Sequence, residues 1–182
     1  QKIDWSVKMI CIPIISKNVE SAVVDLKKAN NLAEIIELRI DCLSNLDLKK
    51  LLKAAKKPVI VTNRRKSDNG KFKGSEEERL AALKHAIELG ADYVDIEIDA
   101  DYKDIISNKK NSKIIVSYHN FNETPDNIDE IFNKLNSTDA DVVKIVTTAN
   151  KLTDNLKIIE LIKKSKKPII SLCMGELGEI SR

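Results

Sequence analysis

The chain has 182 residues, 42% of them hydrophobic and 32% charged, which suits one globular domain with a core of its own. The net charge is only +3, because 31 basic residues are interspersed with 28 acidic ones, and aromatic residues make up 4%. This balance argues against a nucleic-acid partner, since the sequence offers neither a basic stripe nor a set of aromatic side chains for base stacking.

Seven short apolar runs predict buried strands, because they are rich in β-branched residues and bounded by polar ones. They are residues 9–15, 35–41, 58–64, 93–99, 113–119, 141–147 and 168–174. A weak internal repeat supports this pattern, since a Lys-Lys-Pro turn leads into both residues 58–64 and residues 168–174.

Helices are predicted between these strands. Asn18 is a cap for residues 19–31, and Ser75 and Glu78 form a capping box for a helix that runs to Gly90. Thr124-Pro125 is expected to open another helix, with proline in the first turn. Further helices are expected over residues 47–55, 102–107 and around 156–164.

The alternation of strand and helix predicts parallel strands with helices outside them. Two architectures fit: a doubly wound sheet and a (β/α)8 barrel of the TIM type. The dinucleotide-binding version of the doubly wound sheet has little support, because no GxGxxG motif follows the first strand.

Polar residues gather at the C-terminal ends of the predicted strands. They are Glu37, Arg39 and Asp41, Thr62 to Arg64, Glu97 and Asp99, Ser117 and His119, and Lys144 within residues 141–147. In a barrel core the inward positions are usually Val, Ile or Leu, and unpaired charges there would each cost several kcal/mol. The cluster is instead typical of the active-site face of a (β/α)8 enzyme.

Lys144 is the most informative member of this set. A buried ammonium is disfavoured, so burial lowers the pKa of a lysine and makes its free amine available to attack a carbonyl. The alternative is a lysine whose charged end reaches solvent while its stem packs on the strand. His119 follows a buried strand and is a candidate general acid and base near neutral pH.

Several of the other charges have structural explanations. Glu97 and Asp99 are candidate caps of the following helix, and Arg39 is a candidate partner of Glu37 in an ion pair. Arg65 and Lys66 are expected to be solvated loop charges.

Three cysteines, Cys11, Cys42 and Cys173, lie in or beside strand-like runs without CxxC spacing, which predicts reduced, packed thiols in a cytoplasmic protein. No apolar run is long enough for a membrane span, and the first residues lack a signal-peptide pattern.

In these residues the chain resembles the type I 3-dehydroquinate dehydratases, the Schiff-base class of the shikimate pathway. Five blocks carry the resemblance, in the family's order. They are Glu37-Leu-Arg39-Ile-Asp41; Thr62-Asn-Arg64 with Gly70 and Gly74-Ser-Glu-Glu-Glu-Arg79; Ser117-Tyr-His119-Asn-Phe121 with Thr124-Pro125; Val143-Lys144-Ile145; and Met174-Gly175 with Ser181-Arg182.

The resemblance implies that Lys144 forms an imine with the C3 ketone of 3-dehydroquinate and that His119 is the acid and base. It also implies that Glu37, Arg39, Arg64, Arg182 and Met174 bind substrate, with Arg182 on the carboxylate. No metal or organic cofactor is expected, because the protonated imine is itself the electron sink. A homodimer is expected on the resemblance alone.

Two departures from the family stand out. The family has a glutamate four residues after the arginine of the third strand, where it helps to orient the histidine. That position is Asp68 here, so we expect Asp68 to take this role with one methylene less of reach. The family also continues beyond the Ser-Arg pair, whereas this chain ends at Arg182. We therefore expect a single barrel domain over residues 1–182, with the eighth strand and last helix missing.

Three alternatives remain open: another Schiff-base barrel such as a class I aldolase, a truncated inactive barrel that serves as a binding module, and one part of a multifunctional shikimate-pathway polypeptide. An aldolase of sugar phosphates would usually need a phosphate site from the last two loops of the barrel. The Ser117-x-His119 pattern favours the dehydratase.

Overall fold

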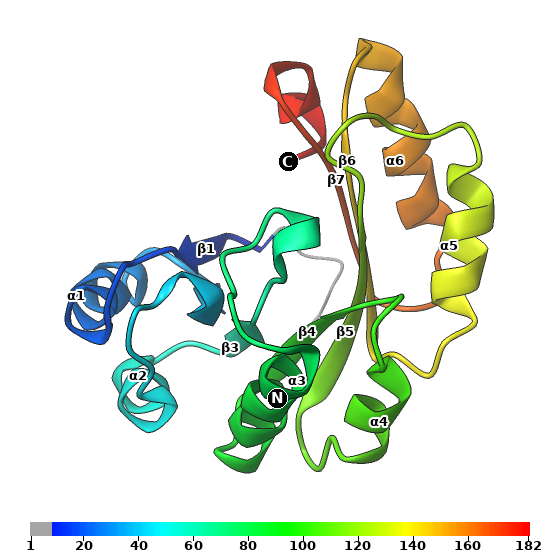
Figure 1. The fold of residues 1–182 in the computed structure, drawn as a ribbon. Coiled ribbons are helices and arrows are strands. Elements are labelled where there is room, and N and C mark those ends of the chain that lie inside the picture. The colour runs from blue at the N-terminus through cyan, green and yellow to red at the C-terminus, as the bar shows by residue number, and fades with distance from the viewer. Residues whose placement is uncertain (1–8) are drawn as a thin grey trace. The chain divides into compact units, whose positions relative to one another are not determined.

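The computed structural model describes residues 9–182. Within this range the chain forms two compact units, shown as a ribbon in Figure 1. Unit 1 comprises residues 9–96 and Lys103–Lys113, and unit 2 comprises Glu97–Tyr102 and Ile114–Arg182. Strands and helices alternate along the described residues, as the sequence predicts.

Unit 1 contains a parallel sheet in which the strands follow one another in chain order. Its strands are β1 (Cys11–Ile14), β2 (Ile35–Arg39), β3 (Val59–Thr62) and β4 (Tyr93–Glu97). Its helices are α1 (Val19–Ala29), α2 (Leu48–Ala54), α3 (Glu76–Glu88) and α4 (Tyr102–Ser107). Alternate strand residues such as Ile36, Leu38 and Val61 are fully buried and form the core of this unit.

Two helices of unit 1 begin where the sequence predicts. The Asn18 side chain accepts from the Ser21 N–H at 2.9 Å, and the Ser21 hydroxyl lies 3.4 Å from the Asn18 N–H, which completes a capping box. Ser75 and Glu78 form the same arrangement at the start of α3. Gly90, just beyond α3, has a φ of +85°, the left-handed conformation that glycine adopts most readily.

Unit 2 contains three parallel strands, β5 (Lys113–His119), β6 (Val142–Thr148) and β7 (Ile169–Met174). Helices α5 (Ile128–Asn136) and α6 (Leu152–Lys164) lie side by side against this sheet (Figure 1). The Ser171 hydroxyl donates to the Ile158 carbonyl of α6 at 3.1 Å, which identifies the helix-covered face of β7.

The two Lys-Lys-Pro turns make the same kind of backbone hydrogen bond, one in each unit. The Pro58 carbonyl accepts from the Ile36 N–H at 3.0 Å, and the Pro168 carbonyl accepts from the Val143 N–H at 3.0 Å. In both cases the proline carbonyl begins the pairing of a strand with the strand before it in the sequence.

The class of the fold, α/β with parallel strands, is confirmed, but the helix prediction at Thr124-Pro125 is wrong. Helix α5 begins only at Ile128, after Asn127. The reason is that the Thr124 hydroxyl bonds to the Thr148 carbonyl at 3.1 Å and pairs with the Thr147 hydroxyl at 2.8 Å. The Thr124 hydroxyl is thus held at β6 instead of at the first turn of α5.

Two smaller predictions are also corrected. Strand β2 ends at Arg39, and Asp41 lies in a 3₁₀ turn (Ile40–Cys42), so Asp41 does not continue the strand alternation. All three cysteines are free thiols, but Cys11 is exposed rather than packed, while Cys173 is buried. Among residues 9–182 no helix is both long and apolar enough to cross a bilayer.

Candidate active site

Lys144 and His119 lie on one face of the unit 2 sheet. Lys144 pairs in register with Ser117 on β5, and His119 pairs with Val146 on β6. Because side chains alternate along a strand, Ser117, His119 and Lys144 point to the same side. The strand spacing and the rise per residue place the Cα atoms of His119 and Lys144 about 8 Å apart.

This face is opposite to the one that α5 and α6 cover. Thr147 and Ser171 occupy the alternate positions of β6 and β7, and Ser171 bonds to α6. Met174, paired with Thr148, lies on the Lys144 side. Unit 2 therefore brings three of the predicted site residues, Lys144, His119 and Met174, to one face.

Lys144 is half-buried in the structure, whereas its neighbours Val143 and Ile145 are fully buried. The strand around Lys144 is thus buried as predicted, but the Lys144 side chain is only partly buried. A half-buried lysine keeps its stem among apolar atoms while its amine can meet a small molecule.

His119 is held by an aromatic contact. Its imidazole stacks on the Phe121 ring with the ring centres 5.9 Å apart and the planes within 8° of parallel. The stacking restricts the imidazole orientation on the sheet face that carries Lys144. A defined ring orientation is what proton transfer to and from a bound molecule requires.

Arg182 follows β7 after a 3₁₀ helix (Glu176–Ser181). Gly175 has a φ of +82°, and its carbonyl accepts from the Arg182 guanidinium at 2.8 Å. The Ser181 hydroxyl accepts from the Cys173 N–H at 2.8 Å and donates to the Gly178 carbonyl at 2.8 Å. Arg182 is exposed, and its guanidinium has no further hydrogen-bond partner within residues 9–182.

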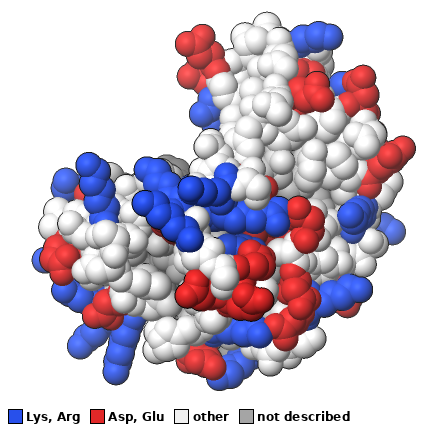
Figure 2. Space-filling model, viewed as in Figure 1, with Lys and Arg blue, Asp and Glu red and all other residues white. Residues whose placement is uncertain are grey.

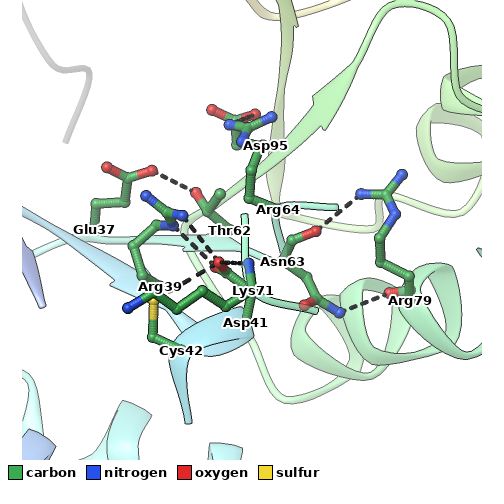
Figure 3. A network of polar contacts seen from close by, with 10 residues as sticks. All are labelled: Glu37, Arg39, Asp41, Cys42, Thr62, Asn63, Arg64, Lys71, Arg79 and Asp95. Atoms are coloured by element: carbon green, nitrogen blue, oxygen red, sulfur yellow. Dashed lines mark hydrogen bonds and ion pairs between the residues drawn. The ribbon is translucent and has the colours of Figure 1, made fainter. Parts of the chain in front are cut away.

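In unit 1, the predicted residues Glu37 and Arg39 lie on the sheet face that points away from α3. Register pairs Arg39 with Thr62, and Thr62 with Asp95, so these side chains share a face with Glu37. Asn63 points the other way, and its side-chain amide donates to the Arg79 carbonyl of α3 at 3.3 Å. Figure 3 shows these residues together.

Glu37 and Arg39 each have a partner in this network. The Thr62 hydroxyl donates to the Glu37 carboxylate at 2.7 Å. Arg39 donates to both carboxylate oxygens of Asp41, from Nε and Nη2, at 2.9 Å each. The Arg39 Nη1 atom has no hydrogen-bond partner within residues 9–182. The sequence suggested a pair between Arg39 and Glu37, but the bidentate partner is Asp41.

The Arg39–Asp41 pair shifts both pKa values. Burial alone would raise the pKa of Asp41, but the hydrogen bonds and charge of Arg39, with the backbone N–H of Lys71, hold it below its ordinary value. Burial alone would lower the pKa of Arg39, and the same pair raises it. Burial and then the charge of Asp41 raise the pKa of the neighbouring Cys42 thiol, which therefore stays protonated at neutral pH.

Arg64 is anchored in a second pair that sequence reasoning did not single out. Its guanidinium donates to Asp95 at 2.8 Å, with 5% of the Arg64 side chain and none of the Asp95 side chain exposed. The available signal was a carboxylate within a buried strand, which is rarely tolerated without a partner. Arg39 and Arg64 are thus each paired with a carboxylate. The two pairs provide oriented N–H donors on this sheet face but add no net positive charge.

Asp68 lies in a 3₁₀ turn (Lys66–Asp68) after β3. Its carboxylate pairs with the Arg65 guanidinium and accepts from the Ser67 hydroxyl at 3.0 Å. Arg65 is therefore a partner of Asp68 and not a solvated loop charge, as the sequence had suggested. Asn69 closes the turn with a φ of +57°, and Gly70 has no space for a Cβ atom beside the Arg64 carbonyl.

A cavity of about 720 Å³ lies beside the Asp41 turn within unit 1. Lys17, Lys71 and Lys73 line it, and none of the three has an ion-pair partner in the described part of the chain. Figure 2 shows that Lys and Arg side chains gather over the segment that follows β3. Residues 9–182 contain no group of His, Cys, Asp and Glu that could hold a metal ion.

Parallel strands with charged and hydroxyl side chains at their C-terminal ends, including a lysine and a histidine on one face, have the layout of an α/β enzyme site. The family model described as type I 3-dehydroquinase matches residues 10–182. The chain therefore belongs to the type I 3-dehydroquinase family.

Individual relatives agree with this assignment. The 3-dehydroquinate dehydratase of Methanocaldococcus jannaschii is 39% identical over 181 residues, which cover 96% of this chain and 82% of that protein. A bifunctional 3-dehydroquinate dehydratase/shikimate dehydrogenase of Arabidopsis thaliana is 37% identical, and the match spans 96% of this chain but only 31% of that longer protein.

A solved structure is also similar. The type I 3-dehydroquinate dehydratase of Clostridium difficile, crystallised with covalently modified comenic acid, aligns with a TM-score of 0.84 and 27% identity. The alignment covers 96% of this chain and 78% of that one.

Proposed function

We propose that the chain is a lyase that converts 3-dehydroquinate to 3-dehydroshikimate through an imine on Lys144. The observation that carries this proposal is that Lys144 and His119 lie on one sheet face, two register positions apart on neighbouring strands, in a chain of the type I family. The relatives named above bear the name of this activity.

The first half of the reaction joins substrate to enzyme. The neutral Lys144 amine attacks the C3 carbonyl carbon, and loss of one water from the resulting carbinolamine gives a protonated imine. His119 supplies and removes the protons of these steps. The half-buried position of Lys144, between the fully buried Val143 and Ile145, supports this role.

The second half eliminates water from the ring. His119 takes a proton from C2, and the electron pair flows into the imine to give an enamine. The enamine electrons then form the C1–C2 double bond while the C1–OH bond breaks. The hydroxyl takes a proton from His119 and leaves as water. Hydrolysis of the imine then releases 3-dehydroshikimate and restores Lys144, so the net reaction is the loss of one water.

We also propose substrate-binding roles for the remaining predicted residues. Glu37, Arg39 and Arg64 bind ring hydroxyls as oriented hydrogen-bonding groups, since each arginine charge is balanced by a carboxylate. The spare Nη1 of Arg39 supports this role. Arg182 binds the substrate carboxylate through its planar fork, and Met174 packs against the ring.

We also propose an orienting role for Asp68 toward His119. The network of Asp68 with Arg65 and Ser67 supports the role in one respect, because it holds the carboxylate in a defined turn.

We propose that residues 1–182 belong to one (β/α)8 barrel domain. The order of the βα units and the TM-score of 0.84 to the Clostridium difficile enzyme support this architecture. A homodimer and a cytoplasmic location stay predictions. Sedimentation velocity tests the first, with a single species of monomer mass as the contradicting result.

The activity is tested by mixing the chain with 3-dehydroquinate and following the ultraviolet absorbance of the conjugated product. Lys144→Met should lower turnover on the order of 10³-fold or more, because no other step replaces the imine. Lys113→Met is the matched control, since Lys113 is also a half-buried lysine on a strand of the same sheet. Equal rates for Lys144→Met and the parent chain would contradict the proposal.

A further inference from the structure

The segment after His119 is tied to the end of β6 by hydrogen bonds. The Asn120 N–H donates to the Val146 carbonyl at 2.9 Å, and the Thr148 hydroxyl donates to the Asn120 carbonyl at 3.3 Å. Both groups of the Asn120 backbone are thus held by β6. The residue that follows His119 cannot move without breaking one of these bonds.

The loop beyond Asn120 is closed by its own side chain. The Asn120 Oδ1 atom accepts from the N–H groups of Asn122 and Glu123, both at 3.0 Å, which turns the chain back on itself. The Asn150 side chain then donates to the Asn122 carbonyl at 2.9 Å. The Asn120 Nδ2 atom donates over a long 3.5 Å to the Tyr118 hydroxyl. A carboxylate at position 120 would lose this donor but keep the oxygen that closes the loop.

The helix-covered face contributes a separate anchor. The Thr124 hydroxyl has one proton and donates it to the Thr148 carbonyl, so in their 2.8 Å contact Thr147 donates to Thr124. This pair fixes the start of the segment that leads to α5. It contacts neither the Asn120 carbonyl nor the aromatic ring that stacks on His119.

Thr148 lies on the same face of β6 as Lys144, four residues further along the strand. Its hydroxyl restrains the peptide plane between Asn120 and Phe121, and Phe121 stacks on the His119 imidazole. A continuous path of contacts therefore runs from the strand that carries the lysine to the ring of the histidine.

We propose that Thr148 is a positioning residue that sets where the His119 imidazole lies relative to Lys144. The inference deepens the function proposed above and rests on it for its catalytic consequence. Thr148 touches neither substrate nor reacting atoms in this account. It acts through the Asn120–Phe121 peptide.

The expected effect on catalysis follows from geometry. A misplacement of about 1 Å in a catalytic group can lower a rate by about 10²-fold. Loss of one of the two backbone anchors of Asn120 should displace the imidazole by less, so Thr148→Val should lower kcat by about tenfold. KM should stay within about threefold, because no substrate contact is removed. Thr148→Ser keeps the hydroxyl and should retain the parent kcat.

A nuclear magnetic resonance measurement without substrate tests the positioning itself. The chain has two histidines, His85 and His119, so a spectrum of the Cε1–H groups contains two signals that His85→Gln assigns. The stacked Phe121 ring shifts the His119 signal through its ring current. Thr148→Val should move this signal, Thr148→Ser should leave it at the parent position, and the exposed His85 should be unaffected in both.

Ser171→Ala is the matched control, because it removes a buried hydroxyl from the opposite face of the same sheet. It should leave the His119 signal unchanged. If Thr148→Val does not fold, Asn120→Ala against Asn120→Asp provides the same comparison, with the signal moved only in the alanine variant.

An unmoved His119 signal in Thr148→Val would overturn the inference, as would a Thr148→Ser variant that is as impaired as Thr148→Val. Failure of the proposed function would look different. A parent chain without turnover, but with a His119 signal that depends on the Thr148 hydroxyl, would retain the positioning role and refute the reaction.

Discussion

Neutralising Asp41 should destabilise the protein, because this carboxylate is the buried centre of the unit 1 network. It accepts two hydrogen bonds from Arg39 at 2.9 Å and one from the Lys71 N–H at 3.0 Å, and none of its side chain is exposed. Asp41→Asn keeps the size of the side chain but replaces one carboxylate oxygen by an NH2 group. This group would face the N–H donors of Arg39 or Lys71.

The magnitude follows from the burial of the two partners. Breaking a buried ion pair by removing one charge costs about 3–5 kcal/mol. Arg39 is 21% exposed, so water recovers part of the loss, and we expect about 2–3 kcal/mol for Asp41→Asn at pH 7. The assay is urea unfolding followed by far-ultraviolet circular dichroism. Asp129→Asn, which removes an exposed pair with Lys164, should leave the midpoint unchanged.

The pH dependence gives the sign of the effect. The folded-state pKa of Asp41 is lowered, so its stabilisation is complete above the unfolded-state pKa of about 3.9 and is lost as the pH falls through the folded value. The difference between parent and Asp41→Asn should therefore be full at pH 7 and shrink below pH about 4. Equal midpoints at pH 7, or a difference that persists undiminished in acid, would show that the Asp41 carboxylate does not stabilise the fold.

Two further predictions concern glycine packing and surface charge. Gly178→Ala should lower the urea midpoint, because a Cβ atom there would lie 2.5 Å from the Cys173 carbonyl oxygen; an unchanged midpoint would contradict the close packing. Lys71→Gln with Lys73→Gln should lower kcat/KM a few-fold at low ionic strength and much less at high salt, because lysines without carboxylate partners attract an anionic substrate. A loss that is independent of salt, measured by initial rates from about 10 mM to 0.5 M salt, would point to a structural cause instead.

Local signals were sufficient to predict most of the fold. Asn18 and Ser75 mark helix starts that depend on a few neighbouring residues, so the sequence contains all the information for these caps. The strands were predicted by their apolar, β-branched runs for the same reason. The two Lys-Lys-Pro turns likewise lead into β3 and β7.

Pairings between distant segments could not be predicted in this way. Thr124-Pro125 has the pattern of a helix start, but a bond to Thr148, far along the chain, takes the Thr124 hydroxyl. Arg64 finds Asp95 across two strands, and only the register of the sheet brings them together. Sequence alone suggested the chemistry of these residues but not their partners.

The candidate site shows the same division. The residue pattern singled out Lys144 and His119, the family resemblance implied their roles, and the strand register then placed both on one sheet face. Phe121 was present in the matched block, but its stacking on the imidazole required the structure. The bidentate bond of Arg39 to Asp41 also depends on the 3₁₀ turn that ends β2, which apolar periodicity does not reveal.

The most direct test of the central claim is to trap the imine. The chain is incubated with 3-dehydroquinate, reduced with borohydride, and analysed by intact mass and peptide mapping. We expect one covalent adduct, on the peptide that contains Lys144, and none in Lys144→Met. An adduct on another lysine, or no adduct in the parent chain at saturating 3-dehydroquinate, would contradict the proposed imine on Lys144.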